Sequence, residues 1–144
     1  MGKIHILVVD DSVMIRNLVS HVLAEDSDLE VVGTAPNGRI ALAKIPLLSP
    51  DIITLDIEMP EMDGLATLTE IRKLYPSMPV IMFSALTEQG AQATLEALSL
   101  GASDYVTKPL HAGSFENAVE YIRQELISKV KALCHKSPSV EIHV

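Results

Sequence analysis

The sequence predicts an α/β fold in which helices cover both faces of one parallel sheet. Two observations lead to this prediction: short apolar runs of strand length alternate with longer segments of helical periodicity, and four of the runs end on a polar residue. Parallel neighbours need crossovers of about a dozen residues or more, and such crossovers are right-handed. We therefore expect a flavodoxin-like (βα)5 domain, a doubly wound parallel sheet with the strand order 2-1-3-4-5.

The first two strand and helix pairs end before Pro50. In order, they are a strand at 4–9, a helix at 13–23, a strand at 29–35 and a helix after Asn37. Asp11 or Ser12 can cap the first helix, and Asn37 can cap the second. Pro46 and Pro50 are expected to stop the second helix, because proline has no backbone N–H and clashes with the preceding turn.

The second half repeats the alternation. It holds a strand at 52–55, a helix after Asp63, a strand at 80–83, a helix after Thr87, a strand at 103–107 and a last helix from about Ser114. Pro76 should end the first of these helices, and Gly101 should supply a left-handed stop for the second. Apolar positions at helical spacing should face the sheet. They are Leu65, Leu68, Ile71 and Leu74, then Leu95 and Leu98, and finally Phe115, Ala118, Val119, Ile122, Leu126, Val130 and Leu133.

The composition fits a single domain in a reducing, cytoplasmic compartment. Cys134 is the only cysteine, so one chain can form neither a disulfide nor a thiolate metal site. Asp10 and Asp11 interrupt the first apolar run, which is too short for a signal peptide, and no stretch approaches membrane-spanning length. The net charge of −8 argues against a nucleic-acid surface. We expect neither membrane insertion nor nucleic-acid binding.

Four predicted strands end on groups that suit phosphoryl transfer. In chain order these groups are Asp10 and Asp11, Asp56, Ser84 and Lys108. The carboxyl ends of parallel strands share one edge of the sheet, where open α/β folds bind ligands. Three carboxylates in one pocket repel one another and require a cation. Mg²⁺ is the predicted ion, because it prefers carboxylate, carbonyl, water and phosphate oxygens.

Asp56 is the predicted nucleophile of this pocket. An ionised carboxylate beside the metal can attack phosphorus and form an acyl phosphate. Lys108 and Ser84 could then contact phosphoryl oxygens. Each residue alone has a structural explanation, as a helix start, a turn or a strand end, and short motifs often match by chance. The joint placement of all the groups at the ends of alternating strands favours the site.

These residues also carry a family resemblance. The segments VVDDS, LDIEMPEMDG, Ser84-Ala85 and YVTKP resemble a response-regulator receiver domain, over residues 3 to about 133. The resemblance implies that a histidine kinase phosphorylates Asp56. The implied Mg²⁺ ligands are Asp10, Asp11, Asp56 and the backbone carbonyl of Glu58.

The resemblance extends to a switch. It implies that Lys108 and Ser84 contact the phosphoryl group and that Tyr105 is an aromatic side chain that rotates inward as Ser84 moves. The family also has a cis peptide bond between the residues that match Lys108 and Pro109, a state that the sequence alone does not establish here.

Two longer segments narrow the resemblance. TLDIEMPEMDGL and SALTEQGAQATLEALSLGASDYVTKP are similar to the receivers of chemotaxis protein-glutamate methylesterases of the CheB type. This implies a receiver at 1–133, followed at 134–144 by the start of an interdomain linker or a disordered tail. Phosphorylation would relieve inhibition of a C-terminal methylesterase and deamidase domain. Implied partners are the kinase of a chemotaxis array, that effector domain and chemoreceptors. The chain alone is expected to catalyse nothing beyond its own phosphorylation and dephosphorylation.

The sequence leaves two other classes of function open, a receiver with another output and a phosphatase. The chain could be a stand-alone receiver or the receiver of a transcription factor, and sequence beyond Val144 would decide between these. A Mg²⁺-dependent phosphatase of the haloacid dehalogenase type also uses an aspartate nucleophile. That family shows Asp-x-Asp at the nucleophile, whereas the residue two after Asp56 is Glu58.

Overall fold

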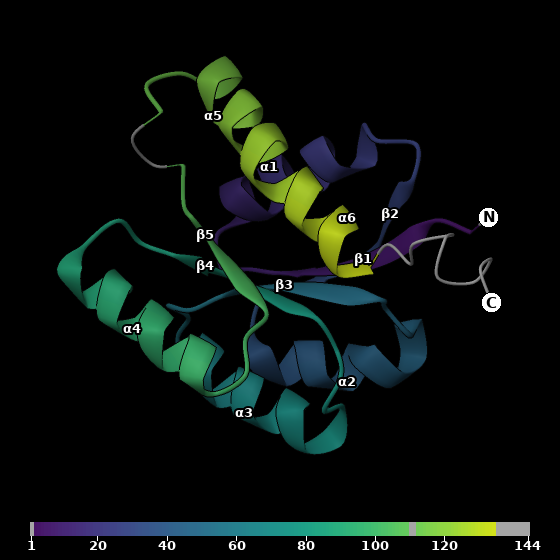
Figure 1. The fold of residues 1–144 in the computed structure, drawn as a ribbon, viewed down its shortest axis with the longest axis vertical. Coiled ribbons are helices and arrows are strands. Elements are labelled where there is room, and N and C mark those ends of the chain that lie inside the picture. The colour runs from purple at the N-terminus through teal and green to yellow at the C-terminus, as the bar shows by residue number, and fades with distance from the viewer. Residues whose placement is uncertain (1, 110–111, 135–144) are drawn as a thin grey trace, which may run out of the picture.

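Five parallel strands form one sheet in the predicted order β2-β1-β3-β4-β5 (Figure 1). The computed structural model describes residues 2–109 and 112–134. The strands are β1 (Ile4–Val9), β2 (Leu29–Ala35), β3 (Ile52–Asp56), β4 (Val80–Ser84) and β5 (Asp104–Thr107). The fold class and the strand order expected from the sequence are therefore confirmed. The expected linker falls outside the described residues except for Cys134.

Helices cover both faces of the sheet, with α1, α5 and α6 on one face and α2, α3 and α4 on the other (Figure 1). Their bounds are α1 (Val13–Ala24), α2 (Gly38–Leu48), α3 (Gly64–Leu74), α4 (Glu88–Ser99), α5 (Phe115–Ile122) and α6 (Ser128–Cys134), with a π-helical turn η1 (Arg123–Ile127) between the last two. Five helices begin on a side chain that accepts a backbone N–H bond, namely Ser12, Asn37, Asp63, Thr87 and Ser114. Of the two expected caps for the first helix, Ser12 is the one used.

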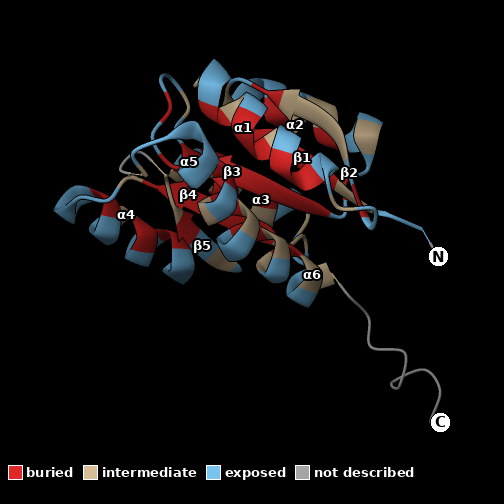
Figure 2. Ribbon diagram, turned by 90° about the horizontal axis from the view of Figure 1, so that it is seen from above, coloured by how far each residue is buried: buried red, intermediate tan, exposed pale blue. Residues whose placement is uncertain are grey.

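The core consists of two apolar layers separated by the sheet. Successive residues of a strand point to opposite faces. Ile6 and Val8 of β1 therefore pack toward α1 and α5, whereas Leu7 and Val9 pack toward α2 and α3. Figure 2 shows the central strands as buried. Burial on both faces explains why these strands read as uninterrupted apolar runs in the sequence.

Pro46 does not stop α2, contrary to expectation. The helix continues through Pro46 to Leu48 and ends where Ser49 takes a left-handed conformation, with φ 48°. The proline removes one N–H from the helical ladder. Ala41 and Ile45, which precede the proline, remain buried in the core, and Leu48 after it packs against the same core. Tertiary packing therefore outweighs the local penalty.

Three leucines expected to face inward lie on the surface. Leu74, Leu95 and Leu98 are 62%, 68% and 37% exposed. The side of α4 that contacts the sheet carries small residues instead, namely Gly90, Thr94 and Ala97. Because small side chains let α4 approach the sheet closely, Leu95 and Leu98 are left on its outer side, whereas Leu74 is the last residue of α3.

The last helical segment is one predicted helix interrupted by a π-helical turn. We call α5, η1 and α6 together the terminal helix. Its buried stripe contains the predicted Val119, Ile122, Leu126 and Val130, whereas Phe115 and Leu133 are exposed. The steps from 122 to 126 to 130 are each four residues, which drift by about 40° per step in an α-helix. The wider π-helical turn absorbs this drift and keeps the stripe on the core.

Candidate functional site

The three predicted acidic residues lie together at the carboxyl edge of the sheet. One carboxylate oxygen from each of Asp10, Asp11 and Asp56 lies within 4.8 Å of the others. β1 and β3 are neighbours, with Val9 opposite Leu55, so the residues that follow these two are side by side. Asp10 and Asp56 are buried and Asp11 is exposed. The cluster is therefore open to solvent on the side of Asp11.

Asp56 has one bonded and one free oxygen. Its Oδ1 lies 2.7 Å from Lys108 Nζ and accepts the backbone N–H of Glu58 at 3.2 Å. Its Oδ2 is buried and has no hydrogen-bond partner among the described residues. A buried carboxylate oxygen without a partner is costly. The donor set thus fits a site that a cation completes.

Burial raises the pKa of Asp56 to about 7. Lys108 opposes this rise, while the neighbouring Asp10 and Asp11 add to it. Burial likewise raises the pKa of Asp10, against the Ser12 N–H bond to its carboxylate and the charge of Lys108. Both carboxylates therefore gain from a nearby positive charge, as expected of metal ligands.

Lys108 reaches Asp56 from β5 across the end of β4. Its backbone N–H donates to Ser84 O at 2.8 Å, and its Nζ lies 3.4 Å from Glu58 Oε1. Burial lowers its pKa, but the bond to Asp56 and the surrounding negative charges outweigh this, and the pKa is raised. Lys108 is therefore a cation in this pocket. The state of the Lys108–Pro109 bond, which the sequence left open, is trans, because none of the described peptide bonds is cis.

The loop after β3 packs tightly on the strand end. A Cβ at Gly64 would lie 2.2 Å from Asp56 O and 2.6 Å from Ile57 Cα, so only glycine fits there. The Gly64 N–H also donates to Ile57 O at 2.7 Å. This close approach positions Glu58, whose N–H bonds Asp56 Oδ1. The backbone of Glu58, the predicted source of a carbonyl ligand, therefore lies beside the carboxylate.

Ser84 and Tyr105 flank a second cavity beside the aspartates. Ser84 is buried at the end of β4, opposite Thr107 of β5, whereas Tyr105 is 41% exposed. The cavity measures about 410 Å³, and we call it the Tyr105 cavity. Its lining includes Ser84, Thr94, Leu98, Tyr105 and Thr107. The predicted switch residue is thus on the surface with space available next to it.

Sequence reasoning missed two polar contacts around the site. Arg16 Nη1 donates to the backbone carbonyl of Asp10 at 2.6 Å. Arg16 follows the cap residue Ser12 by four positions and so lies on the same side of α1, a spacing that could have indicated it. The hydroxyls of Thr107 and Tyr121 bond each other, which ties the terminal helix to the residue before Lys108.

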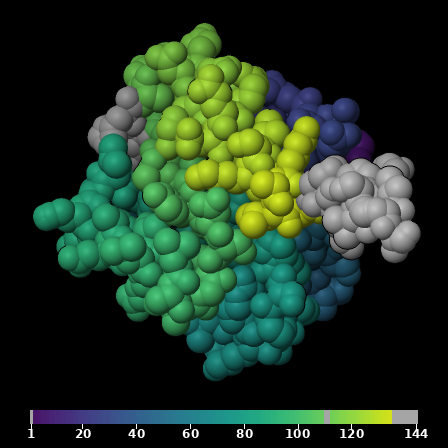
Figure 3. All heavy atoms as spheres, viewed as in Figure 1, coloured from purple at the N-terminus to yellow at the C-terminus, as the bar shows by residue number. Residues whose placement is uncertain are grey.

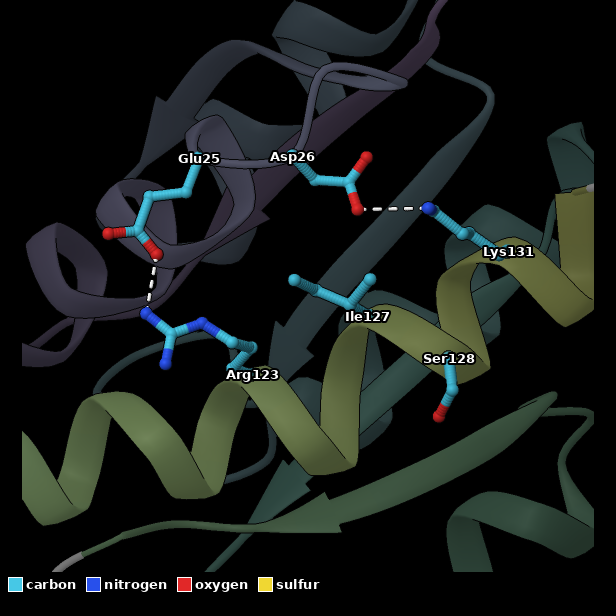
Figure 4. Close-up of a pocket in the computed structure, with 6 residues that line it drawn as sticks. All are labelled: Glu25, Asp26, Arg123, Ile127, Ser128 and Lys131. Atoms are coloured by element: carbon cyan, nitrogen blue, oxygen red, sulfur yellow. Dashed lines mark hydrogen bonds and ion pairs between the residues drawn. The ribbon is translucent and has the colours of Figure 1, made fainter.

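A charged cleft at the opposite edge of the sheet does not suit catalysis (Figure 4). It lies between the end of α1 and the terminal helix. Arg123 Nη2 lies 2.7 Å from Glu25 Oε1, and Lys131 Nζ lies 2.9 Å from Asp26 Oδ2. The side chain of Ile127 projects between the two pairs (Figure 4). Since each of these cations is paired with an acid, the cleft acts as a clamp on the terminal helix.

None of the helices in the described ranges is both long and apolar enough to cross a membrane.

Comparison with known proteins gives one consistent result. The family model of the response regulator receiver domain matches residues 6–120. A protein-glutamate methylesterase/protein-glutamine glutaminase of Trichodesmium erythraeum is 57% identical over 143 residues, which are 99% of this chain and 41% of that protein. Its counterpart in Nocardioides is 56% identical over 92% of this chain and 36% of its own length. The chain therefore spans about two fifths of the length of these relatives.

Solved structures agree in fold and in sequence. The response regulator domain of Thermotoga maritima CheB is 40% identical with a TM-score of 0.81, over 94% of this chain and 99% of that one. A CheX-CheY-BeF3-Mg²⁺ complex from Borrelia burgdorferi contains a chain that is 30% identical with a TM-score of 0.69, over 85% of this chain and 89% of that one.

Proposed function

The chain belongs to the response regulator receiver domain family of two-component signalling, and from this premise we propose that Asp56 accepts the phosphoryl group. The observation that carries this proposal is the buried Asp56 Oδ2, which has no partner among the described residues although Lys108 and Glu58 occupy the other oxygen. An oxygen held in this way can bond a cation or phosphorus without first breaking a protein contact.

Receiver domains generally bind Mg²⁺ at an acidic pocket, and this chain has such a pocket. The proposed ligands are the carboxylates of Asp10, Asp11 and Asp56 and the backbone carbonyl of Glu58. When bound, the ion neutralises charge between these carboxylates and the incoming phosphoryl group. The proximity of the three carboxylates and the raised pKa values of Asp10 and Asp56 support this assignment.

The chemistry needs a nucleophile and a fixed positive charge. Asp56 forms the new P–O bond while the P–N bond of a histidine kinase phosphohistidine breaks, and the imidazole leaves with the electron pair. Lys108 exchanges part of its contact with Asp56 for a phosphoryl oxygen, which its position 2.7 Å from Oδ1 supports. We assign the Ser84 hydroxyl to another phosphoryl oxygen and Tyr105 to the switch that follows.

We also propose the output. Residues 1–133 would form the receiver, and residues 134–144 would begin the connection to an effector. The relatives are named protein-glutamate methylesterase/protein-glutamine glutaminase, so the proposed effector is a methylesterase and deamidase domain that phosphorylation releases from inhibition. A chemotaxis histidine kinase and chemoreceptors would be the partners. These names favour this output over a stand-alone receiver or a transcription factor.

Intact mass spectrometry tests the phosphorylation. The chain is treated with acetyl phosphate and Mg²⁺, beside a sample without metal, Asp56→Asn and the matched control Asp51→Asn at the other end of the same strand. We expect one Mg²⁺-dependent phosphoryl adduct in the wild type and in Asp51→Asn that is stable to acid and labile to hydroxylamine. Asp56→Asn should show none. An adduct on Asp56→Asn would overturn the assignment, and sustained phosphomonoester turnover would favour the phosphatase instead.

A fusion experiment tests the output. The chain is joined to the catalytic domain of a relative, and receptor-methylester hydrolysis is measured with and without phosphodonor. Stimulation that Asp56→Asn abolishes is the expected result, whereas equal activity with and without donor would contradict the coupling.

A further inference from the structure

Lys129 of the terminal helix contacts Tyr105 of β5 in two ways. Its Nζ donates to the Tyr105 backbone carbonyl at 2.7 Å and lies 5.3 Å from the centre of the Tyr105 ring. It also lies 3.7 Å from Asp104 Oδ1. Figure 3 shows the terminal helix beside β5 on one face of the molecule. The ammonium is thus held by two oxygen atoms in a position where the ring can rest against it.

The structure leaves space for a second position of the Tyr105 side chain. The Tyr105 cavity lies next to its ring and extends to Ser84, the residue that pairs with Thr107 at the end of β4. A volume of about 410 Å³ accommodates an aromatic side chain. The ring therefore lies outward against Lys129, and the cavity leaves space for it beside Ser84.

We propose that Lys129 is a positioning residue that holds Tyr105 outward and thereby opposes the phosphorylated state. This inference rests on the proposed function, in which Tyr105 is the switch. A cation over the face of an aromatic ring attracts it, and the attraction is lost when the ring turns away. Since the contact exists only in the outward state, it shifts the population toward that state.

The contact also connects the terminal helix to the phosphorylation pocket. Lys129 lies in α6, the element that precedes residues 135–144. Inward rotation of Tyr105 removes the cation–π contact between α6 and β5, so the signal reaches the helix that leads toward the proposed effector. The dependence is reciprocal, because whatever displaces Lys129 makes the inward state easier to reach.

Beryllofluoride with Mg²⁺, used in place of a phosphoryl group, provides the test. Tyrosines are labelled with ¹³C, the Tyr105 ring signals are assigned with Tyr105→Phe, and the apparent dissociation constant for beryllofluoride is measured at fixed Mg²⁺. The variants are Lys129→Met and Lys129→Arg. Lys131→Met is the matched control, because Lys131 is on the same helix but pairs with Asp26 and Asp28 at α1.

Lys129→Met should move the Tyr105 signals of the free protein toward their positions in the beryllofluoride complex. It should also tighten beryllofluoride binding roughly two- to fivefold, the range that an exposed cation–π contact contributes. Lys129→Arg should stay near the wild type, since its guanidinium also stacks on rings. Lys131→Met should change neither the ring signals nor the binding.

Each other outcome has a definite meaning. If the Tyr105 signals move with beryllofluoride in the wild type but Lys129→Met and Lys131→Met behave alike, the role of Lys129 is wrong and the proposed function stands. If beryllofluoride binds without moving these signals, both the switch and the role of Lys129 are wrong. If Mg²⁺ and beryllofluoride do not bind, the phosphoacceptor site is wrong and the role of Lys129 falls with it.

Discussion

Lys108 and Asp56 form an ion pair that satisfies only half of a buried carboxylate. Nζ lies 2.7 Å from Oδ1, while Oδ2 has no partner among the described residues. Lys108 directly follows β5 and Asp56 ends β3, and β4 separates these two strands, so the pair depends on the strand order. Breaking one side of a buried ion pair is costly. The lysine therefore stabilises the ionised form of Asp56, the proposed nucleophile, but also competes with any cation at the site.

Lys108→Met should bind Mg²⁺ more tightly and accept a phosphoryl group more slowly. Removing the ammonium relieves its repulsion of the metal by at least about 1 kcal/mol, the value for unit charges 4 Å apart in water. Affinity should therefore rise roughly fivefold or more, as measured by NMR titration with Mg²⁺. The adduct forms more slowly because the positive charge that faces the phosphoryl oxygens is gone.

Lys73→Met is the control for this substitution. Lys73 is a surface residue of α3 that pairs with Glu70, so its removal should leave both Mg²⁺ affinity and phosphorylation unchanged. Weaker Mg²⁺ binding in Lys108→Met would show that Lys108 organises the site rather than competing with the ion.

The metal-free protein should lose stability as the pH rises from about 4 to 7. Burial raises the pKa of Asp56 to about 7 in the fold, from an ordinary value of 3.8. An acid whose folded pKa is raised stabilises the fold fully below its unfolded pKa and loses that stabilisation as the pH rises through the folded pKa. The free energy of unfolding should fall by up to about 1.4 kcal/mol per pH unit in this range. The free energy of unfolding by urea is measured in EDTA at several pH values for the wild type and for Asp56→Asn. The difference between the two should fall as the pH rises. A difference that does not change with pH would contradict the raised pKa.

Topology made the strands and the site predictable. β1 and β2 begin and end at the expected residues, because strands buried on both faces read as continuous apolar runs. The acidic cluster followed from strand order alone, since Asp10 and Asp56 end neighbouring strands. Ser12 and Thr87 were recognisable as caps from their own side-chain chemistry.

Contacts that depend on tertiary packing were not predictable in the same way. Pro46 stays inside α2 because the helix is held by the buried Ala41 and Ile45 before it and by Leu48, which packs against the core after it. Leu95 and Leu98 were assigned inward by their hydrophobicity, although Ala97 and Thr94 make the contact. Lys129 and Tyr105 are far apart in sequence, and no pattern indicates that a lysine donates to a strand carbonyl.

Gly64→Ala should destabilise the fold and weaken Mg²⁺ binding. A Cβ there would lie 2.2 Å from Asp56 O, and these backbone atoms cannot move away without shifting Asp56. We expect a loss of about 1–3 kcal/mol in the free energy of unfolding by urea. The loss would occur although alanine favours helices over glycine by about 1 kcal/mol.

Gly2→Ala is the comparison for this substitution, because nothing lies within 4 Å of its added Cβ. Equal stability of Gly64→Ala and Gly2→Ala would show that the loop after β3 yields without affecting Asp56.

Arg16→Met should loosen the metal site through the backbone of Asp10. Arg16 Nη1 donates to the Asp10 carbonyl at 2.6 Å, and Asp10 N–H donates to Ala35 O at 3.0 Å, so the peptide groups on both sides of Asp10 are held. Losing a charged hydrogen bond costs about 1.5–3 kcal/mol of stability.

Removing a positive charge near the aspartates would by itself strengthen Mg²⁺ binding, so weaker binding in Arg16→Met means that the carboxylate has lost its position. We expect weaker binding, with the exposed Arg39→Met unchanged, in NMR titrations with Mg²⁺ at two salt concentrations. Binding that tightens and is sensitive to salt would instead assign Arg16 a purely electrostatic effect.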